Sequence, residues 1–294
     1  MIEDLYPSRG GLKAELIARK DPVVYSDQTE ECPLTPDELN KYKNNGFLVL
    51  ENVFSNDEVD SFKLEIENLK NKDMIRNSDH TITEPESGEV RSIFKVHEIS
   101  QVFKNMASHP RLKAIAEYIL NDDVYIHQSR INYKPGFKGK EFYWHSDFET
   151  WHIEDGMPQM RALSMSITLT DNYTHNGSLL LIPGSHHVYA VCEGYTPDNH
   201  FKESLKKQEY GIPGNNSLEE MVKNGGIITA TGKPGTVIIF DCNTMHGSNG
   251  NITPFPRSNV FFVYNAISNK VVEPYCQQPP RPEYICSRKT IQKL

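Results

Sequence analysis

Two histidines and an aspartate offer the donor set of a mononuclear metal site. His145 and Asp147 lie two residues apart in the segment EFYWHSDFETWH, and His246 follows the later apolar run TVIIFD. Residues two apart on a strand point to the same face, so we expect His145 and Asp147 to present an imidazole and a carboxylate to one ion. Two histidines and one carboxylate leave three octahedral positions open, which suits a bidentate co-substrate and O₂ on iron(II).

The spacing His-x-Asp is not specific by itself, because the chain has eleven histidines and a second motif of the same spacing at His152 and Glu154. Arg257 supports the first motif as the metal site. It follows His246 in the chain and stands at the start of the apolar run NVFFVYN. A guanidinium can clamp the distal carboxylate of a dicarboxylate co-substrate with two hydrogen bonds. The alternative interpretation of Arg257 is an ordinary surface ion pair.

Short runs rich in β-branched and aromatic residues must position these side chains. They begin at residue 123, include DVYIHQSRINY, MSITLTD, SLLLIPG, TVIIFD and NVFFVYN, and alternate with turns such as PGF and KPG. This pattern is typical of an all-β barrel or sandwich. Polar residues share one face of the first run: Gln128, Arg130, Asn132 and Lys134. Such a row indicates either a wet cavity or a solvent-exposed face.

Helical segments precede the strands. TPDELNKYKNN is predicted to form a short helix that ends at Gly46, because Thr35 can cap it and a proline follows the cap. Ser55 and Glu58 fit a capping box at the start of SNDEVDSFKLEIENLKNK, whose apolar residues recur at helical spacing. Another helix is predicted over residues 110–120. The fold class is therefore mainly β with flanking helices.

The length of 294 residues suits a single domain of this class, so residues 1–294 are predicted to form one domain. Residues 1–34 are polar without a sustained period, which predicts an extended N-terminal arm that wraps the domain. The polar stretch 193–226 is predicted to be an insertion with a helix near SLEEMVKN. Both segments are candidates for a cover over the active site.

The bulk composition argues against several classes of partner. The chain has 39 acidic and 31 basic residues and a formal charge of −8, whereas a nucleic-acid partner requires a basic face. The N-terminal segment has no apolar run long enough for a signal peptide or a membrane span, so we expect a cytoplasmic protein without a membrane partner. The five cysteines of the chain are scattered without a CxxC pair, which argues against a disulfide framework or a thiolate zinc site.

Four segments have a more specific pattern: EDLYPSR, HQSRINYKPGFKGKEFYWHSDFETWHIEDGMPQMRALS, NGSLLLIPGSHH and FDCNTMHGSNGNITPFPRSN. They resemble ectoine hydroxylases of the phytanoyl-CoA dioxygenase superfamily, and the resemblance covers nearly the whole chain. The motif HSDFETWHxEDGMP is specific to ectoine hydroxylases, whereas HxD, PGSH and the later His-Arg pair occur across the superfamily.

This resemblance implies a double-stranded β-helix core of the jelly-roll or cupin type. It also implies a homodimer that hydroxylates ectoine to the compatible solute 5-hydroxyectoine, with Fe(II) as cofactor and 2-oxoglutarate and O₂ as co-substrates, releasing succinate and CO₂. The implied site residues are His145, Asp147 and His246 for iron, Lys134 and Arg257 for 2-oxoglutarate, and Gln128, Trp151, Phe240 and Phe261 for the substrate.

The residues themselves leave alternatives open for part of this site. Aromatic faces attract a delocalised cation, so Trp151, Phe240 and Phe261 suit a small zwitterionic cyclic substrate, with core packing as the alternative. Ser164 is a candidate contact of 2-oxoglutarate, although an outward strand face explains its alternation with apolar residues equally well. His152 is assigned to a structural role.

Substrate identity stays open among related compounds. Leu180, Tyr195 and Ala266 stand where ectoine hydroxylases usually have methionine, a small or acidic residue, and serine. Related hydroxylases of the superfamily act on free L-proline or similar cyclic amino acids, which is the second prediction for this chain. A third is a non-catalytic metal-binding barrel, which is disfavoured because a pure binding domain has no need of an open facial site.

Overall fold

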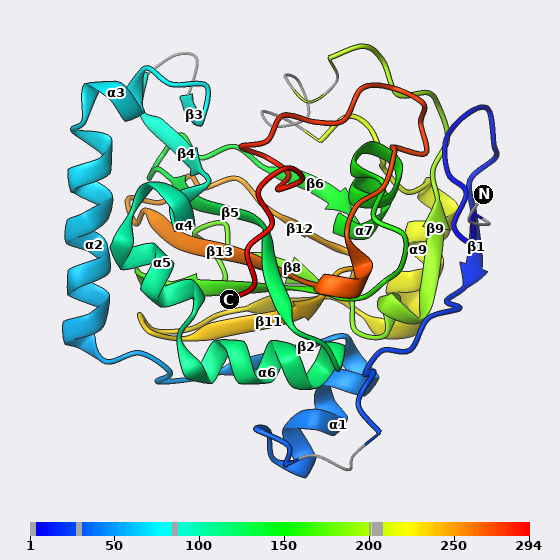
Figure 1. The fold of residues 1–294 in the computed structure, drawn as a ribbon, viewed down its shortest axis with the longest axis horizontal. Coiled ribbons are helices and arrows are strands. Elements are labelled where there is room, and N and C mark those ends of the chain that lie inside the picture. The colour runs from blue at the N-terminus through cyan, green and yellow to red at the C-terminus, as the bar shows by residue number, and fades with distance from the viewer. Residues whose placement is uncertain (1–3, 28–30, 84–87, 200, 202–207) are drawn as a thin grey trace.

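Two antiparallel β-sheets form the centre of the molecule (Figure 1). The computed structural model describes residues 4–27, 31–83, 88–199, 201 and 208–294. Over these ranges the larger sheet has the strand order β2-β11-β7-β13-β5-β4-β3, the smaller sheet has the order β10-β8-β12-β6, and β1 pairs with β9. The strands are β1 (Glu15–Ala18), β2 (Phe47–Leu50), β3 (Thr81–Thr83), β4 (Val90–Phe94), β5 (Val124–Lys134), β6 (Phe142–His145), β7 (Ala162–Thr168), β8 (Leu179–Leu181), β9 (Val188–Val191), β10 (Ile228–Ala230), β11 (Val237–Asp241), β12 (His246–Ser248) and β13 (Arg257–Ala266).

Most of the helices precede the long strand β5 in the chain, as the sequence predicts. The helices α2 and α6 flank the large sheet in Figure 1. The α-helices are α1 (Pro36–Asn45), α2 (Asn56–Lys70), α3 (Asp73–Arg76), α4 (Val96–Ile99), α5 (Gln101–Ala107), α6 (Pro110–Leu120), α7 (Asp147–Thr150) and α9 (Asn215–Gly225). A π-helical turn (Trp151–Asp155) continues α7, and 3₁₀ turns occur at Ser185–His187 and Ile267–Asn269.

The predicted helix starts are confirmed by their caps. Thr35 Oγ1 accepts a hydrogen bond from the backbone N–H of Glu38 at 3.3 Å, and α1 ends at Gly46, whose φ of +80° is left-handed. Ser55 and Glu58 form the reciprocal capping box expected at the start of α2. Each cap satisfies backbone donors that the first helical turn leaves unpaired.

Alternate residues of the large sheet pack against the helical layer. Val260, Phe262 and Tyr264 of β13 join Phe62 of α2 and Leu112 of α6 in one buried apolar cluster. Because successive strand residues point to opposite faces, the residues between them face the smaller sheet. The outer face of the large sheet therefore forms the main core.

The inner face of the large sheet packs against the smaller sheet. Phe240 of β11 and Phe261 of β13 share a second cluster with Leu179 and Leu181 of β8. The space between the two sheets is therefore lined by inner-face residues. This arrangement confirms the prediction of a mainly β structure with flanking helices.

The N-terminal arm contains a strand that the sequence analysis did not predict. Residues Glu15–Ala18 form β1, which pairs antiparallel with β9, and Tyr6 is fully buried. The strand is short and its burial does not alternate cleanly, so no sequence period marks it. In the predicted insertion 193–226, α9 includes the expected helix, whereas residues 200 and 202–207 lie outside the described ranges.

No helix in the described part of the chain combines the length and the apolar character that crossing a membrane requires.

Candidate metal centre and co-substrate pocket

The three predicted ligands converge at one end of the space between the sheets. The Nε2 atoms of His145 and His246 lie 3.7 and 3.9 Å from the same carboxylate oxygen of Asp147. The two imidazole centroids are 4.2 Å apart. One donor atom from each residue lies within 4.8 Å of the others, which is close enough for all three to bind one cation. The prediction that these residues come together is confirmed.

Asp147 does not lie on the strand that the sequence predicts for His145 and Asp147, so this prediction was wrong. Strand β6 ends at His145, Ser146 is the cap of α7, and Asp147 is the first helical residue. The carboxylate reaches the imidazole because the chain turns into a helix at this point, rather than because the two side chains alternate along a strand. His246 opens β12 and is the cross-strand partner of His145.

Each histidine ligand is held by a backbone carbonyl. The Nδ1 of His145 bonds the carbonyl of Tyr143 at 2.8 Å, and the Nδ1 of His246 bonds the carbonyl of Thr244 at 2.9 Å. A carbonyl can only accept, so Nδ1 carries the proton and the Nε2 lone pair is free for a metal. Burial, followed by the neighbouring His246, lowers the pKa of His145 to about 3, which keeps that imidazole neutral.

These donors fit a divalent transition metal such as iron(II). Neutral imidazoles and a carboxylate suit Fe(II), and the set is not closed by a fourth protein ligand among the described residues. Ser164 lies on β7 and donates from Oγ to Asp147 Oδ2 at 3.2 Å. Because Ser164 is 1% exposed, the interpretation of an outward strand face is wrong for it.

The second His-x-acid motif has a structural role, as predicted for its histidine. His152 bonds the carbonyl of Met157 at 2.7 Å and the carboxylate of Asp4 at 2.9 Å, so both ring nitrogens have partners. Glu154 pairs with Arg9 at 2.7 Å. Both side chains are therefore already engaged in contacts with other residues of the protein.

Another group of possible ligands, His127, Asp155 and Cys286, is already neutralised. Arg281 pairs with the carboxylate of Asp155 through two nitrogens, at 2.7 Å from Nε to Oδ1 and at 2.5 Å from Nη2 to Oδ2. His127 Nε2 bonds the same carboxylate at 3.1 Å. Burial raises the pKa of the Cys286 thiol, which opposes the thiolate that a metal requires. We therefore assign this group to the core.

A pocket between the sheets joins the histidine ligands to Arg257. Arg257 is 2% exposed, and its Nε and Nη1 have no hydrogen-bond partner among the described residues. Burial, followed by the charge of Arg130, lowers the pKa of Arg257 to about 10. The alternative of a surface ion pair is wrong. A buried cation with unpaired donors is unfavourable unless an anion binds it, which fits a carboxylate ligand in this pocket.

Lys134 lies beside Arg257, because the two residues are cross-strand partners on β5 and β13. Its Nζ donates to Ser248 Oγ at 2.8 Å and to the carbonyl of Asn249 at 2.6 Å. The side chain passes two glycines so closely that an added Cβ at Gly139 would lie 2.4 Å from Lys134 Cγ, and one at Gly177 would lie 2.5 Å from Cδ. These glycines leave the space through which the lysine reaches the pocket.

The predicted aromatic contacts take different positions. Phe261 lines the pocket, and the Phe240 ring lies 5.0 Å from that of His246. Trp151 is buried in a cluster that includes Phe148, and it meets the His127 ring edge-on at 5.4 Å. Among the described residues that line the pocket, Trp151 and Phe240 are absent.

The polar row on β5 faces inward rather than toward solvent. Arg130 and Asn132 line the pocket, and the Arg130 guanidinium lies 5.1 Å from the centre of the Phe261 ring. Gln128 is 6% exposed; its Nε2 donates to the carbonyl of Ile285 at 2.9 Å. Arg130 belongs to this row, but no role for it was predicted from the sequence. Its shared face with Lys134 was the signal that could have identified it.

Comparison with known proteins agrees with this geometry. The family model described as Phytanoyl-CoA dioxygenase (PhyH) matches residues 42–259. The chain is 54% identical over 287 residues to "Ectoine dioxygenase" of Sphingopyxis alaskensis, covering 98% of this chain and 94% of that protein.

Two solved structures have the same fold as this chain. The crystal structure of EctD from S. alaskensis with 2-oxoglutarate and 5-hydroxyectoine matches with a TM-score of 0.88 at 50% identity, covering 97% of this chain and 95% of that chain. The structure of EctD from S. alaskensis with bound Fe matches with a TM-score of 0.87 at 49% identity and the same coverage. These matches confirm the jelly-roll core.

Proposed function

The chain belongs to the ectoine dioxygenases of the phytanoyl-CoA dioxygenase family, and from this premise we propose that it hydroxylates ectoine to 5-hydroxyectoine. The reaction consumes one 2-oxoglutarate and one O₂ and yields succinate and CO₂. One atom of O₂ enters the new hydroxyl group and the other enters succinate. The observation that carries the proposal is that both histidines of the histidine–carboxylate site line one pocket with a buried arginine, two of whose nitrogens have no partner among the described residues.

The protein's own part in this reaction is binding, orientation and exclusion of water. When bound, iron(II) supplies the activation of O₂ and the oxidative decarboxylation of 2-oxoglutarate. His145, Asp147 and His246 would hold the iron. Arg257 and Lys134 would bind the distal carboxylate of 2-oxoglutarate, because both are buried cations at the same end of the pocket. Ser164 would orient Asp147 through its hydrogen bond, and we keep it as a candidate contact of 2-oxoglutarate.

A small zwitterionic ring fits the remaining groups. Arg130 offers a cation for the substrate carboxylate, and burial lowers its pKa, so an anion nearby would be stabilised. Phe261 lines the pocket and offers an aromatic face for a delocalised cation, and Phe240, whose ring lies 5.0 Å from that of His246, would lie next to it. Gln128 accepts from Arg130 Nη1 at 3.4 Å and Trp151 continues the helix that begins with Asp147, so we assign both a place at the substrate end.

Assembly and location are part of the same proposal. We propose a cytoplasmic homodimer that makes a compatible solute. All five cysteines are free, which suits a reducing compartment. Residues 1–294 would act as one domain, with 193–226 as the cover. Supporting this cover, Thr196 accepts a hydrogen bond from Arg9 at 2.9 Å, and Arg9 in turn pairs with Glu149 near the metal carboxylate. Light scattering of the purified protein tests the dimer.

Parallel reactions with ectoine and L-proline test the substrate. Purified protein with Fe(II), ascorbate, 2-oxoglutarate and O₂ receives each compound, and mass spectrometry follows the product and succinate. We expect ectoine to gain one oxygen with equal succinate, and His145→Ala to abolish both. Oxidation of L-proline alone would contradict the assignment to ectoine but keep the chemistry. Inactivity toward both compounds in protein that contains iron would favour a non-catalytic barrel.

A further inference from the structure

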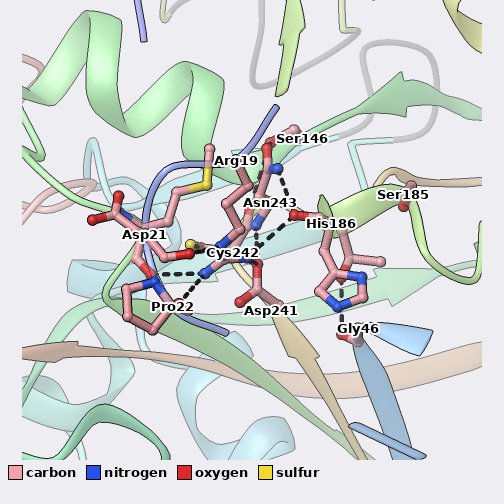
Figure 2. A network of polar contacts seen from close by, with 12 residues as sticks. Arg19, Asp21, Pro22, Gly46, Ser146, Ser185, His186, Asp241, Cys242 and Asn243 are labelled. Carbon is pink, nitrogen blue, oxygen red and sulfur yellow. Dashed lines mark hydrogen bonds and ion pairs between the residues drawn. The ribbon is translucent and has the colours of Figure 1, made fainter. Parts of the chain in front are cut away.

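An asparagine outside the pocket joins the two segments that carry the metal ligands (Figure 2). Asn243 is 1% exposed and lies in the turn between β11 and β12. Its Oδ1 accepts a hydrogen bond from Ser146 Oγ at 3.0 Å. Its Nδ2 donates to the carbonyls of His186 and Val188 at 3.1 and 2.8 Å. The amide oxygen and both amide protons therefore have partners.

Both partners of this link lie close in the chain to metal ligands. Ser146 lies between the histidine and the aspartate of the first motif, and its hydroxyl accepts from the backbone of α7, the helix that begins with the aspartate. On the other segment, Thr244 directly follows Asn243, and its carbonyl holds the Nδ1 of His246 at 2.9 Å. The Ser146–Asn243 bond thus connects the segment of two ligands to the segment of the third.

The turn that contains Asn243 is fixed by a buried arginine from the N-terminal arm. Arg19 donates to Asp241 Oδ1 at 2.8 Å, and the same oxygen accepts from the backbone N–H of Asn243 at 2.8 Å. The other donors of Arg19 bond the carbonyls of Asp21, Pro22, Met160 and His186. A rotation of the turn would leave a buried charge unpaired, so this ion pair restricts the turn to one geometry.

A glycine makes this packing tight. The carbonyl of Gly46 accepts from the backbone N–H of Asp241 and from Thr244 Oγ1, both at 2.8 Å. A Cβ at Gly46 would lie 2.6 Å from Thr244 Oγ1 and 2.5 Å from His186 Nδ1. The C-terminal end of α1 therefore packs tightly against the turn before His246, and this packing leaves the turn little room to move.

We propose that Asn243 is a positioning residue, which sets His145 and Asp147 relative to His246 through its bond to Ser146. Asn243 is not among the described residues that line the pocket, so it acts through the ligand segments. This inference rests on the proposed iron site. Removal of groups that orient metal ligands without binding the metal commonly changes metal affinity or activity, because the ligand set then loses its fixed geometry.

Three variants separate positioning from general stability. Asn243→Ala and Ser146→Ala each remove the same hydrogen bond from one side. Asn269→Ala is the matched control, because Asn269 is also 1% exposed and its amide also makes three hydrogen bonds, two to the backbone of Gln159 and one to Asn265. None of these partners is a metal ligand or a neighbour of one. Thermal unfolding of the metal-free proteins shows how far each variant is destabilised.

The readouts are Fe(II) affinity and coupling of the two half-reactions. Anaerobic titration of metal-free protein with Fe(II) gives the dissociation constant, and mass spectrometry gives the ratio of succinate to 5-hydroxyectoine. We expect Asn243→Ala to weaken Fe(II) binding by about tenfold to a hundredfold and to form succinate in excess of product. Ser146→Ala changes both in the same direction. The double variant loses less Fe(II) affinity than the sum of the two single losses, because both changes remove the same Ser146–Asn243 bond.

Unchanged Fe(II) affinity and coupling in Asn243→Ala would overturn the inference, and so would an equal loss of affinity in Asn269→Ala. If Asn243→Ala does not fold, Ser146→Ala decides by the same criteria. Failure of the unaltered protein to bind Fe(II) contradicts the proposed function instead, which keeps the two failures distinct.

Discussion

Arg257 is the residue whose environment is hardest to explain without a ligand. It is nearly fully buried, two of its nitrogens have no partner among the described residues, and its pKa is lowered. A fold gains no stability from such a group, so its presence points to binding of an anion. Lys134, by contrast, already has two protein partners. The two cations therefore make unequal contributions to the pocket.

Replacement of Arg257 by lysine tests its part in binding 2-oxoglutarate. Arg257→Lys keeps the charge but loses the planar pair of donors, so we expect the KM for 2-oxoglutarate to rise about tenfold to a hundredfold, as the loss of a charged hydrogen bond implies. The KM for ectoine changes less. Arg161→Lys is the control, because Arg161 bonds the carbonyls of Leu120 and Asn121 instead. An unchanged KM for 2-oxoglutarate would refute this role.

The same position predicts an inverse relation between stability and activity. Arg257→Met removes a buried cation whose charged form the fold disfavours, so we expect the free energy of unfolding of the metal-free protein to rise by about 1 kcal/mol while turnover is lost. Urea denaturation measures the first and succinate formation the second. Arg161→Met, which breaks satisfied hydrogen bonds, should be destabilising. A marked loss of stability in Arg257→Met would show that Arg257 has protein partners in solution.

Sequence alone predicts the types and rough positions of these residues, but only part of their contacts. The spacing of His145 and Asp147 and the later His246 identified the ligand set. It could not show that Asp147 opens a helix, because a two-residue spacing fits a strand equally well. The bond from Ser164 to Asp147 also depends on β7 lying beside α7, a long-range contact that no local pattern encodes.

At the scale of elements, the pocket depends on a turn that lies close to the Lys134 side chain. The turn that contains Gly177 allows the Lys134 side chain to pass, and Gly177 has a φ of +77°. Left-handed backbone favours glycine, and the missing Cβ here also leaves space. Both properties are required where the Lys134 side chain extends from β5 to the pocket.

Gly177→Ala tests this route. The added methyl group would overlap Lys134 Cδ, so we expect the lysine to be displaced and the KM for 2-oxoglutarate to rise about tenfold. Gly88→Ala is the control, because Gly88 also has a positive φ, of +66°, but no heavy atom of the described residues lies within 4 Å of an added Cβ. Backbone strain is common to both variants, and only the first has the overlap. Equal effects on KM would mean that strain alone is responsible.

The helices and long strands were predictable because each has a strong local signal. The cap at Thr35 with the proline after it, the capping box at Ser55 and the apolar period of α2 marked their helices. The β-branched runs marked β5, β11 and β13. Strand β1 was missed because four residues with irregular burial have no readable period. This strand forms because it pairs with β9, a long-range contact that its own residues do not indicate.

At the scale of the whole molecule, the layers explain why the site is buried and why several histidines have lowered pKa values. Helices cover the outer face of the large sheet, the smaller sheet covers its inner face, and the arms at both ends of the chain cross the α7 region. Burial is the largest cause of the lowered pKa values of His97, at about 4, and of His145, at about 3.

Acid destabilisation follows from these buried histidines. Between the ordinary pKa of 6.5 and the lowered value of about 4, His97 binds fewer protons in the folded state than in the unfolded state. The free energy of unfolding therefore falls as pH falls through this window, by up to about 1.4 kcal/mol per pH unit for each such group. We expect His97→Gln to show a shallower decline between pH 7 and pH 5 in urea denaturation. Parallel declines for both proteins would rule out this contribution.

The origin of the product oxygen tests the central claim most directly. Purified protein with Fe(II), 2-oxoglutarate and ectoine is allowed to react under ¹⁸O₂ in unlabelled water, and mass spectrometry follows both products. The proposed dioxygenase reaction predicts one ¹⁸O atom in 5-hydroxyectoine and one in succinate, formed in equal amounts. A hydroxylated product and succinate that both lack ¹⁸O, or succinate formed without any hydroxylated ectoine, would contradict the account.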